Sequence, residues 1–245
     1  MSEQKKIALI TGANKGIGLE TARQLAKQGI VVLLGARDVA KGEAAAKELQ
    51  AEGLKVRPVK IDVDDRADHA AIAALIEKEY GVLDILINNA GISLEDFFSN
   101  TTSTTSEEVL RKTFDTNFFS VVALTQTLLP LIRKSEAGRI VNLSSILGSL
   151  TLHATKGSPI EGSKALGYNS SKAALNSFTI HLAAELAGTK IKVNSAHPGW
   201  VKTDMGTDAA PMELVDGAKT SVLLATLAED GPTGGYFHMA ETLPW

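Results

Sequence analysis

The sequence predicts an α/β fold in which helices cover both faces of a doubly wound, mainly parallel sheet. Short apolar runs alternate along the chain with longer segments whose apolar residues recur at helical spacing, and such alternation is typical of βαβ units. A glycine-rich turn, 11–18, joins the first apolar run to the first helical segment. The chain has 245 residues with no internal repeat and no shift in composition, so we expect a single domain over residues 1–245.

Four strands are expected in the first half of the chain, because four short runs are rich in Val, Ile and Leu. They are 7–10, 31–34, 55–61 and 83–87. The helices between them are expected at 19–26, 38–52 and 64–79. Asp64 or Asp65 can cap the third of these helices. Pro58 argues against a central position in the sheet for the strand at 55–61, because proline cannot donate a backbone hydrogen bond to a neighbouring strand.

The second half continues the alternation after a Ser/Thr-rich loop at 99–106. Thr105 with Glu108 fits a capping box, so a long helix is expected to begin there. It is expected to pass Asn117 and to end near Ser135. Two further strands are expected at 139–143 and 191–195, two further helices at 168–186 and 213–227, and an edge strand at 235–237.

The glycine-rich turn has the chemistry of a diphosphate cradle. Gly12, Gly16 and Gly18 are spaced G-x-x-x-G-x-G between a predicted strand and a predicted helix. Glycine lets the backbone approach a ligand closely, and the helix N-terminus offers free N–H groups and a positive dipole to an anion. The spacing differs from the usual G-x-G-x-x-G, and no Lys-Ser or Lys-Thr follows as in a Walker A loop. The strand and helix on either side favour a diphosphate site over a glycine turn that merely ends a strand.

Four polar residues are candidates for catalysis. Tyr168 and Lys172 lie on one face of a predicted helix, where a lysine ammonium favours the phenolate and draws the tyrosine pKa down toward neutral pH. Such pairs also occur on solvated helix surfaces, so the spacing alone does not distinguish a catalytic pair from a surface pair. Ser145 follows a predicted strand, where its hydroxyl can stabilise charge on a carbonyl oxygen or simply form a turn. Asn117 is a poor helix former but is predicted to lie in mid-helix, so its presence there calls for another reason. That reason is either a functional role or a buried amide hydrogen-bonded to the backbone.

Taken together, these motifs resemble the short-chain dehydrogenase/reductase family over essentially the whole chain. The motifs are TGANKGIG at 11–18, Asn88-Asn89-Ala90-Gly91, Asn117, the serine after the fifth strand, Tyr168-x-x-x-Lys172 and Pro198-Gly199. Within the family, further stretches are similar to the monomeric, NADPH-dependent carbonyl reductases. These stretches are 14–15, 35–38, 49–54, 198–203 and the terminal tryptophan.

The resemblance implies a role for each candidate. Tyr168 is the general acid for the carbonyl oxygen, and Lys172 lowers its pKa and holds the nicotinamide ribose. Ser145, with Ser144 as the neighbouring alternative, orients the carbonyl, because the family's catalytic serine is the second of this pair. Asn117 belongs to a water-mediated proton relay. By the same resemblance, Asp62 and Val63 meet the adenine, and Val201 and Thr203 reach the carboxamide. The other implied cofactor contacts are Gly12, Asn14, Lys15, Gly16, Ile17, Gly18, Asn89, Ala90, Gly91 and Pro198.

The choice of NADPH over NADH follows from the end of the second strand. NAD enzymes of this type place a carboxylate there for the ribose 2′-OH, whereas this chain has Ala36 followed by Arg37. A guanidinium can hold a 2′-phosphate bidentately, and Lys15 adds a second cation. Asp38 leaves an alternative open, because a different loop path brings its carboxylate to the ribose.

Composition excludes several classes of protein. The formal net charge is −3, with no basic excess for nucleic acid and no polybasic run for a membrane surface. There is no cysteine, so disulfides, thiolate catalysis and Cys-ligated zinc are excluded. The histidines lack metal-ligand spacing. Residues 1–6 lead into the first strand without a secretory apolar region, and no apolar run can span a bilayer, so we expect a cytoplasmic protein.

The expected activity is NADPH-dependent reduction of a ketone or aldehyde. Ile146, Leu147 and Trp200 flank the site and are candidates for a substrate wall, with core packing as the alternative. An alcohol dehydrogenase, a keto-acyl reductase or a non-catalytic dinucleotide sensor remain alternatives. The loop at 146–167 is longer than in simpler members of the family, and by this resemblance we expect it to obstruct a symmetric interface or to fold over the substrate cleft. We expect a monomer, with a dimer left open.

Overall fold

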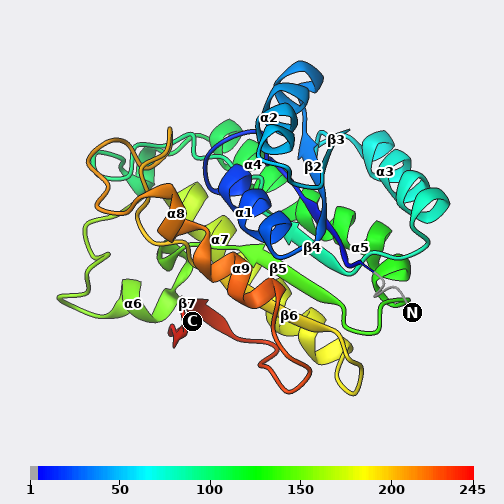
Figure 1. Cartoon of the computed structure of the whole chain (residues 1–245). Helices are drawn as coiled ribbons and strands as arrows, with labels where there is room; N and C mark the ends of the chain where they lie inside the picture. The colour runs from blue at the N-terminus through cyan, green and yellow to red at the C-terminus, as the bar shows by residue number, and fades with distance from the viewer. Residues whose placement is uncertain (1–4) are drawn as a thin grey trace.

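The computed structural model describes residues 5–245, in which one eight-stranded sheet lies between two layers of helices (Figure 1). The strand order is β3-β2-β1-β4-β5-β6-β7-β8. Strands β1 to β7 pair in parallel, and β8 adds antiparallel to β7. The predicted fold class is therefore confirmed. Residues 1–4, part of the segment considered above for a secretory signal, lie outside the described residues.

The strands agree closely with those predicted. They are β1 (Ile7–Ile10), β2 (Val31–Ala36), β3 (Val56–Lys60), β4 (Ile85–Asn88), β5 (Arg139–Leu143), β6 (Lys192–Ala196), β7 (Tyr236–His238) and β8 (Glu241–Thr242). Pro58 is tolerated because β3 is the edge strand and pairs only with β2. The sequence missed β8, which has only two residues.

The helices lie in two layers on either side of the sheet. They are α1 (Gly16–Lys27), α2 (Val39–Ala51), α3 (Arg66–Glu79), α4 (Glu107–Phe114), α5 (Ser120–Ile132), α6 (Leu150–Ala154), α7 (Leu166–Glu185), α8 (Leu214–Gly217) and α9 (Lys219–Ala225). Two short 3₁₀ turns occur at Thr102–Thr104 and Ile146–Gly148, and a π-helical turn at Asp115–Phe119. In Figure 1, α1 and α9 lie in front of the sheet, whereas α5 and α7 lie behind it.

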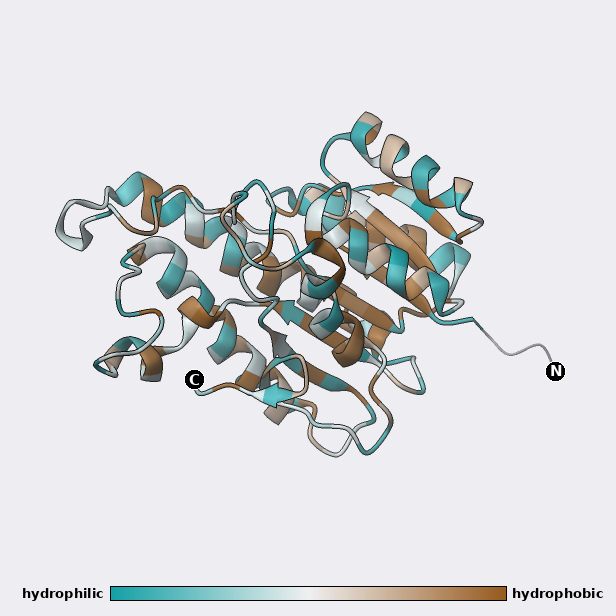
Figure 2. Cartoon of the chain, turned by 60° about the vertical axis from the view of Figure 1, so that its left-hand side comes forward, coloured by the Kyte–Doolittle hydropathy of each residue, from teal (hydrophilic) through white to brown (hydrophobic). Residues whose placement is uncertain are grey.

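Alternating side chains of the strands build two apolar cores. Ile10 packs in one cluster with Leu25 of α1, and Leu9 packs in the other with Leu128 and Leu182 of α5 and α7. All of these residues are buried, and Figure 2 shows the strands as the most hydrophobic part of the chain. Because a parallel sheet is covered on both faces, its strands read as continuous apolar runs. The rigid sheet fixes the positions of the loops at its carboxyl edge.

Four expectations are wrong in detail. The long helix through Asn117 is divided by the π-helical turn. Ser106 rather than Thr105 caps α4, with its hydroxyl accepting from the backbone N–H of Val109 at 3.2 Å, because Thr105 is used in another contact. The helix expected at 213–227 is two helices, α8 and α9. The segment 146–167, expected as a loop, contains a 3₁₀ turn and α6.

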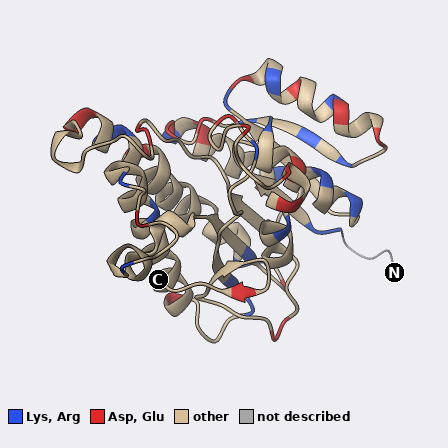
Figure 3. Cartoon of the chain, turned by 90° about the vertical axis from the view of Figure 1, so that its left-hand side faces the viewer, with Lys and Arg blue, Asp and Glu red and all other residues tan. Residues whose placement is uncertain are grey.

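Charged side chains lie mainly on helices and loops, as Figure 3 shows. Asp65 caps α3 by accepting from the backbone N–H of Ala67 at 2.9 Å. Asp64 instead accepts from Lys112, Thr116 and Ser120 and joins the loop after β3 to α4 and α5. Within residues 5–245, no helix combines the length and apolarity that crossing a bilayer requires.

Candidate active site

Tyr168, Ser145 and Lys172 come together at the carboxyl edge of the sheet. Ser145 follows β5 by two residues, and Tyr168 and Lys172 lie one turn apart at the start of α7. The Ser145 hydroxyl lies close enough to the Tyr168 hydroxyl to act on its pKa. The ammonium Nζ of Lys172 lies 5.6 Å from the centroid of the Tyr168 ring. All three residues are buried, with exposed fractions of 9% or less.

Burial controls the protonation of this cluster. It raises the pKa of Tyr168 to about 12, although the nearby Ser145 hydroxyl acts in the opposite direction. Burial also lowers the pKa of Lys172 to about 8. The lysine is held in place because Nζ donates to the carbonyl oxygen of Leu143 at 2.8 Å. The expected lowering of the Tyr168 pKa is therefore outweighed by desolvation, which disfavours the phenolate.

The two candidate serines have different surroundings. The Ser144 hydroxyl donates to the carbonyl oxygen of Lys172 at 3.5 Å, so it is turned toward the backbone of α7. The Ser145 hydroxyl accepts from the backbone N–H of Leu147 at 3.2 Å and caps the following 3₁₀ turn. Its contact with Tyr168 makes Ser145 the serine of the cluster.

Asn117 lies in the π-helical turn and is fully buried. Its Oδ1 accepts from the backbone N–H of Ile92 at 2.8 Å, and its Nδ2 donates to the carbonyl oxygen of Ile92 at 2.9 Å and to Ser171 at 3.0 Å. A Cβ on Gly91 would lie 3.3 Å from Asn117 Oδ1 and 3.4 Å from Lys172 Nζ. The amide therefore fixes the segment after β4 directly beside Lys172.

The glycine turn forms an open cradle at the N-terminus of α1. Gly12 and Gly16 have positive φ values of 62° and 58°, which disfavour other residues. The N-cap residue Lys15 makes no side-chain cap, so the first turn of α1 keeps backbone N–H groups for another partner. A Cβ at Gly18 would lie 2.5 Å from Asn89 Nδ2, so glycine is required for close packing there.

Hydrogen bonds fasten the glycine turn to the segment after β4. The Thr11 hydroxyl accepts from the backbone N–H groups of Asn89 and Ala90, both at 3.0 Å. Asn89 Nδ2 donates to the carbonyl oxygens of Thr11 at 2.7 Å and Gly12 at 3.2 Å. These contacts bring 11–18 and 89–91 together at the carboxyl ends of β1 and β4. The direction in which successive strands are added to the sheet reverses between these two strands. Open α/β sheets bind their ligands at such a point.

The residues expected to select the cofactor lie at the same edge. Arg37 is exposed and directly follows Ala36, the last residue of β2. The Asp38 carboxylate accepts from the backbone N–H of Lys41 at 3.1 Å and caps α2. A hydrogen bond from this carboxylate to the cofactor ribose, the alternative considered from the sequence, would compete with the cap. Lys15 forms an exposed ion pair with Asp204.

The remaining expected cofactor residues flank the cradle. Asp62 and Val63 follow β3 and are half-buried. Thr203 lies over the glycine turn, because a Cβ on Gly16 would be 3.7 Å from its methyl carbon. Val201 is buried and bridges Met212, and Pro198 is buried after β6. Asn14 and Ile17 are half-buried within the turn and the first turn of α1.

Comparison with known proteins assigns the family. The family model for short chain dehydrogenases matches residues 6–214. The chain belongs to the short-chain dehydrogenase family. Among curated relatives, carbonyl reductase (NADPH) 1 of Sus scrofa is 36% identical over 284 aligned residues, which cover 100% of this chain and 96% of that protein. Carbonyl reductase (NADPH) 3 of Rattus norvegicus is 36% identical over 94% of each chain.

Solved structures agree with this assignment. The NADPH-bound carbonyl reductase from chicken fatty liver matches with a TM-score of 0.85 and 28% identity, covering 99% of this chain and 100% of the other. Salutaridine reductase from Papaver somniferum gives a TM-score of 0.83 and 28% identity, over 95% and 99% of the two chains. The predicted family resemblance and oxidoreductase class are confirmed. The predicted NADPH agrees with the cofactor named for these relatives.

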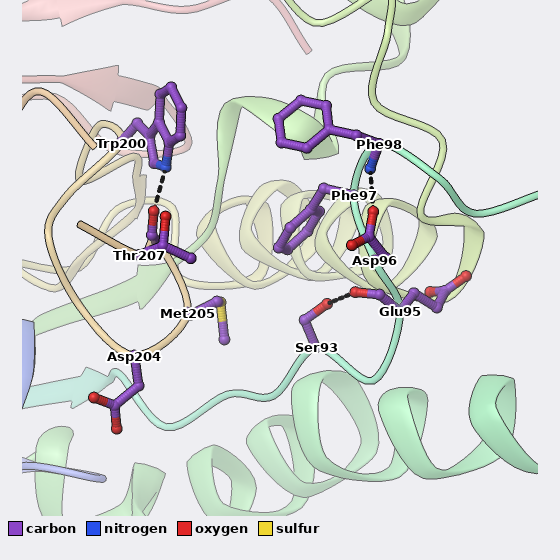
Figure 4. Close-up of a pocket in the computed structure, with 10 residues that line it drawn as sticks. Ser93, Glu95, Asp96, Phe97, Phe98, Trp200, Asp204, Met205 and Thr207 are labelled. Atoms are coloured by element: carbon purple, nitrogen blue, oxygen red, sulfur yellow. Dashed lines mark hydrogen bonds between the residues drawn. The ribbon is translucent and has the colours of Figure 1, made fainter. Parts of the chain in front are cut away.

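This dehydrogenase has a pocket of about 310 Å³ beside the cluster of Tyr168, Ser145 and Lys172 (Figure 4). One side is formed by the segment after β4 and the other by the loop after β6, and Figure 4 shows Phe98 and Trp200 on opposite sides. The Phe97 ring meets the Tyr168 ring edge to face, with centroids 5.2 Å apart. The residues lining the pocket are Ser93, Glu95, Asp96, Phe97, Phe98, Trp200, Asp204, Met205, Gly206 and Thr207.

Sequence reasoning found only Trp200 among these lining residues. Ile146 and Leu147 form the 3₁₀ turn after Ser145 and do not line this pocket, so their contact with substrate stays a prediction. The Phe97-Phe98 pair in a polar loop was the signal available in the sequence. His197 was also missed: its Nδ1 accepts from the backbone N–H of Ile146 at 3.2 Å, and burial lowers its pKa to about 3.

Proposed function

We propose that this short-chain dehydrogenase reduces a ketone or aldehyde with NADPH and that Tyr168 supplies the proton. The observation that supports this most strongly is the buried contact of Tyr168 with Ser145 and Lys172, beside the glycine cradle. The relatives are named carbonyl reductase (NADPH) 1 and 3, which supports the proposal. A binding protein would need no proton donor at this position.

The residues at the carboxyl edge fit NADPH. The uncapped N-terminus of α1 and the left-handed backbone of Gly12 and Gly16 suit a diphosphate. Arg37, exposed at the end of β2, would hold the 2′-phosphate, with Lys15 as a second cation once it leaves Asp204. When bound, NADPH supplies the hydride for the carbonyl carbon. Lys172 would hold the nicotinamide ribose, and the segments 89–91 and 198–203 would surround the nicotinamide end.

The side chains of the cluster divide the work at the carbonyl oxygen. Ser145 donates a hydrogen bond that orients the carbonyl and stabilises the negative charge developing on its oxygen. Tyr168 keeps its proton at neutral pH because burial raises its pKa to about 12, and it transfers this proton to the oxygen as the charge develops. The Lys172 ammonium stabilises the resulting tyrosinate. Asn117 holds Ile92 and Ser171 in place and is the proposed link to water.

The aromatic pocket is the proposed site for the rest of the substrate. Trp200 is fixed because its Nε1 donates to the carbonyl oxygen of Gly206 at 2.8 Å. With Phe97, Phe98 and Met205 it offers apolar and aromatic surface within reach of Tyr168. Aromatic faces contribute large contact areas to ligand binding, so we propose carbonyl substrates with a bulky apolar substituent.

The pH profile of ketone reduction tests the assigned roles. We expect kcat/KM for NADPH to be flat from pH 6 to about 8 and to fall above it, because Lys172, whose pKa burial lowers to about 8, loses its charge as the pH rises. Tyr168 remains protonated throughout this range. A rate that rises through pH 8 would mean that reduction is faster once Lys172 has lost its charge, against the proposal.

We also propose a monomer in the cytoplasm. The insertion 146–167 carries α6, which projects beyond the sheet beside the C-terminus (Figure 1). The backbone N–H of Thr151 donates to the carbonyl oxygen of Trp245 at 2.8 Å, and the Trp245 ring stacks on Tyr236 at 5.4 Å. In a symmetric dimer such an obstruction would intrude from both sides of the axis. Light scattering should give 25.9 kDa, and a stable tetramer would contradict the proposal.

A further inference from the structure

The first turn of α7 carries Tyr168 but has no cap of its own. The N-cap residue Ala165 makes no side-chain hydrogen bond. Helix termini leave backbone N–H groups without a partner and fray easily unless these groups are bound. The backbone of the proposed proton donor therefore depends on a partner from elsewhere in the chain.

Glu95 supplies that partner from 73 residues away. Its Oε2 accepts from the backbone N–H of Tyr168 at 3.0 Å. The other oxygen, Oε1, accepts from Asn100 Nδ2 at 3.0 Å and from the Thr105 hydroxyl at 3.3 Å. This second contact explains why Thr105 does not cap α4. In Figure 4 the Glu95 side chain extends away from the Trp200 side of the pocket.

Gly167 is fitted to this carboxylate. A Cβ at position 167 would lie 2.8 Å from Glu95 Oε2, so only glycine allows the carboxylate to reach the helix end. Two further contacts close the same junction: the backbone N–H of Lys164 donates to the carbonyl oxygen of Phe97 at 3.2 Å, and Asn100 Nδ2 donates to the carbonyl oxygen of Lys164 at 3.0 Å. The pocket wall and the start of α7 thus form one hydrogen-bonded unit.

We propose that Glu95 is a positioning residue for the reduction, which caps α7 and thereby aims the Tyr168 hydroxyl at the substrate carbonyl. A carboxylate at a helix N-terminus is favoured both as a hydrogen-bond acceptor and by the helix dipole. Small displacements of a reacting group lower catalytic rates strongly. The inference rests on the proposed function, because it concerns the proton donor of that reaction.

Two substitutions remove this contact in different ways. Glu95→Ala deletes the acceptor, and we expect kcat to fall about tenfold while KM for NADPH changes by less than about twofold, since the cofactor cradle is not touched. Gly167→Ala adds a Cβ that displaces the carboxylate, and kcat should fall similarly. Alanine is the better helix former, so the melting temperature of this variant should not fall in parallel with kcat.

Rescue and control variants separate positioning from general stability. Glu95→Gln keeps an oxygen acceptor for the Tyr168 N–H and should recover kcat to within about threefold of the wild type. Glu108→Ala removes an exposed charge from the first turn of α4 and should leave kcat unchanged. In the impaired variants the solvent deuterium isotope effect on kcat should increase, because a misplaced Tyr168 makes proton transfer slower.

The kcat of each Glu95 variant is compared with that of Tyr168→Phe. If Tyr168→Phe is inactive, Glu95→Ala reduces kcat selectively, and the double variant is no slower than Tyr168→Phe, then Glu95 acts through Tyr168. If Tyr168→Phe is inactive but Glu95→Ala keeps its kcat, the positioning role is wrong and the proposed function stands. The same conclusion follows if Glu95→Ala loses NADPH affinity and thermal stability together with kcat. If Tyr168→Phe retains full activity, the proposed function itself fails.

Discussion

Replacing Tyr168 with phenylalanine is expected to lower kcat for ketone reduction by about 10²–10⁴-fold, which is the usual contribution of a general acid. The ring and its contact with Phe97 remain, so the fold and the pocket should be preserved. Only the hydroxyl that contacts Ser145 is lost. Binding of NADPH, measured by titration calorimetry, should persist, because the cradle at 12–18 is unchanged.

Tyr80→Phe is the matched control for this experiment. Tyr80 ends α3 at the opposite edge of the sheet, before β4 begins. The same deletion of a phenolic oxygen at that position should leave kcat unaltered. Near-normal reduction by Tyr168→Phe would show that the proton reaches the carbonyl oxygen from another group.

Replacing Arg37 with aspartate is expected to reverse the cofactor preference. Hydrogen bonds to charged groups are the stronger kind, and their loss together with new repulsion of the 2′-phosphate should weaken NADPH about 10- to 100-fold. NADH lacks that phosphate, and its affinity should be unchanged or improved because a carboxylate suits a ribose 2′-OH. Dissociation constants for both cofactors, measured on the same preparation, provide the comparison.

Lys47→Asp controls for the change in net charge. Lys47 is an exposed residue further along α2, and its substitution alters the charge by the same amount away from the end of β2. This variant should bind both cofactors normally. Equal losses of NADPH and NADH affinity in Arg37→Asp would mean that Arg37 does not contact the 2′-phosphate.

The parts of the molecule that follow local periodicity could be predicted from the sequence. The strand at 139–143 was predicted with its observed bounds, because a buried parallel strand is a short apolar run with clear turn signals on either side. The glycine turn was also predictable, since the positive φ values of Gly12 and Gly16 require residue types that the sequence displays. Tyr168 and Lys172 were predicted to share a helix face and do so.

Other parts depend on contacts between segments that are distant in sequence. The π-helical turn at Asn117 does not follow from helix propensity, because the amide is held by Ile92 and Ser171. The choice of Ser106 over Thr105 as a cap depends on Glu95, which binds the Thr105 hydroxyl. The expected pKa of Tyr168 was wrong in direction because burial cannot be read from a Tyr-x-x-x-Lys spacing.

The pocket was the least predictable feature for the same reason. Its walls come from 93–98 and 200–207, two segments that the sheet topology brings together at the carboxyl edge. Loop conformations of this kind are set by tertiary contacts such as the bond from the Lys164 backbone N–H to the carbonyl oxygen of Phe97. The position of Trp200 directly after Pro198-Gly199 indicated an aromatic residue near the site but gave no partner for it.

The most direct test of the central claim is NADPH consumption by the purified protein with a panel of ketones, quinones and aldehydes, together with identification of the product. The account predicts that at least one bulky carbonyl compound is reduced, with one alcohol formed for each NADPH oxidised and with much slower turnover from NADH. Tight binding of NADPH without turnover of any member of the panel would contradict it and would favour a dinucleotide-sensing protein.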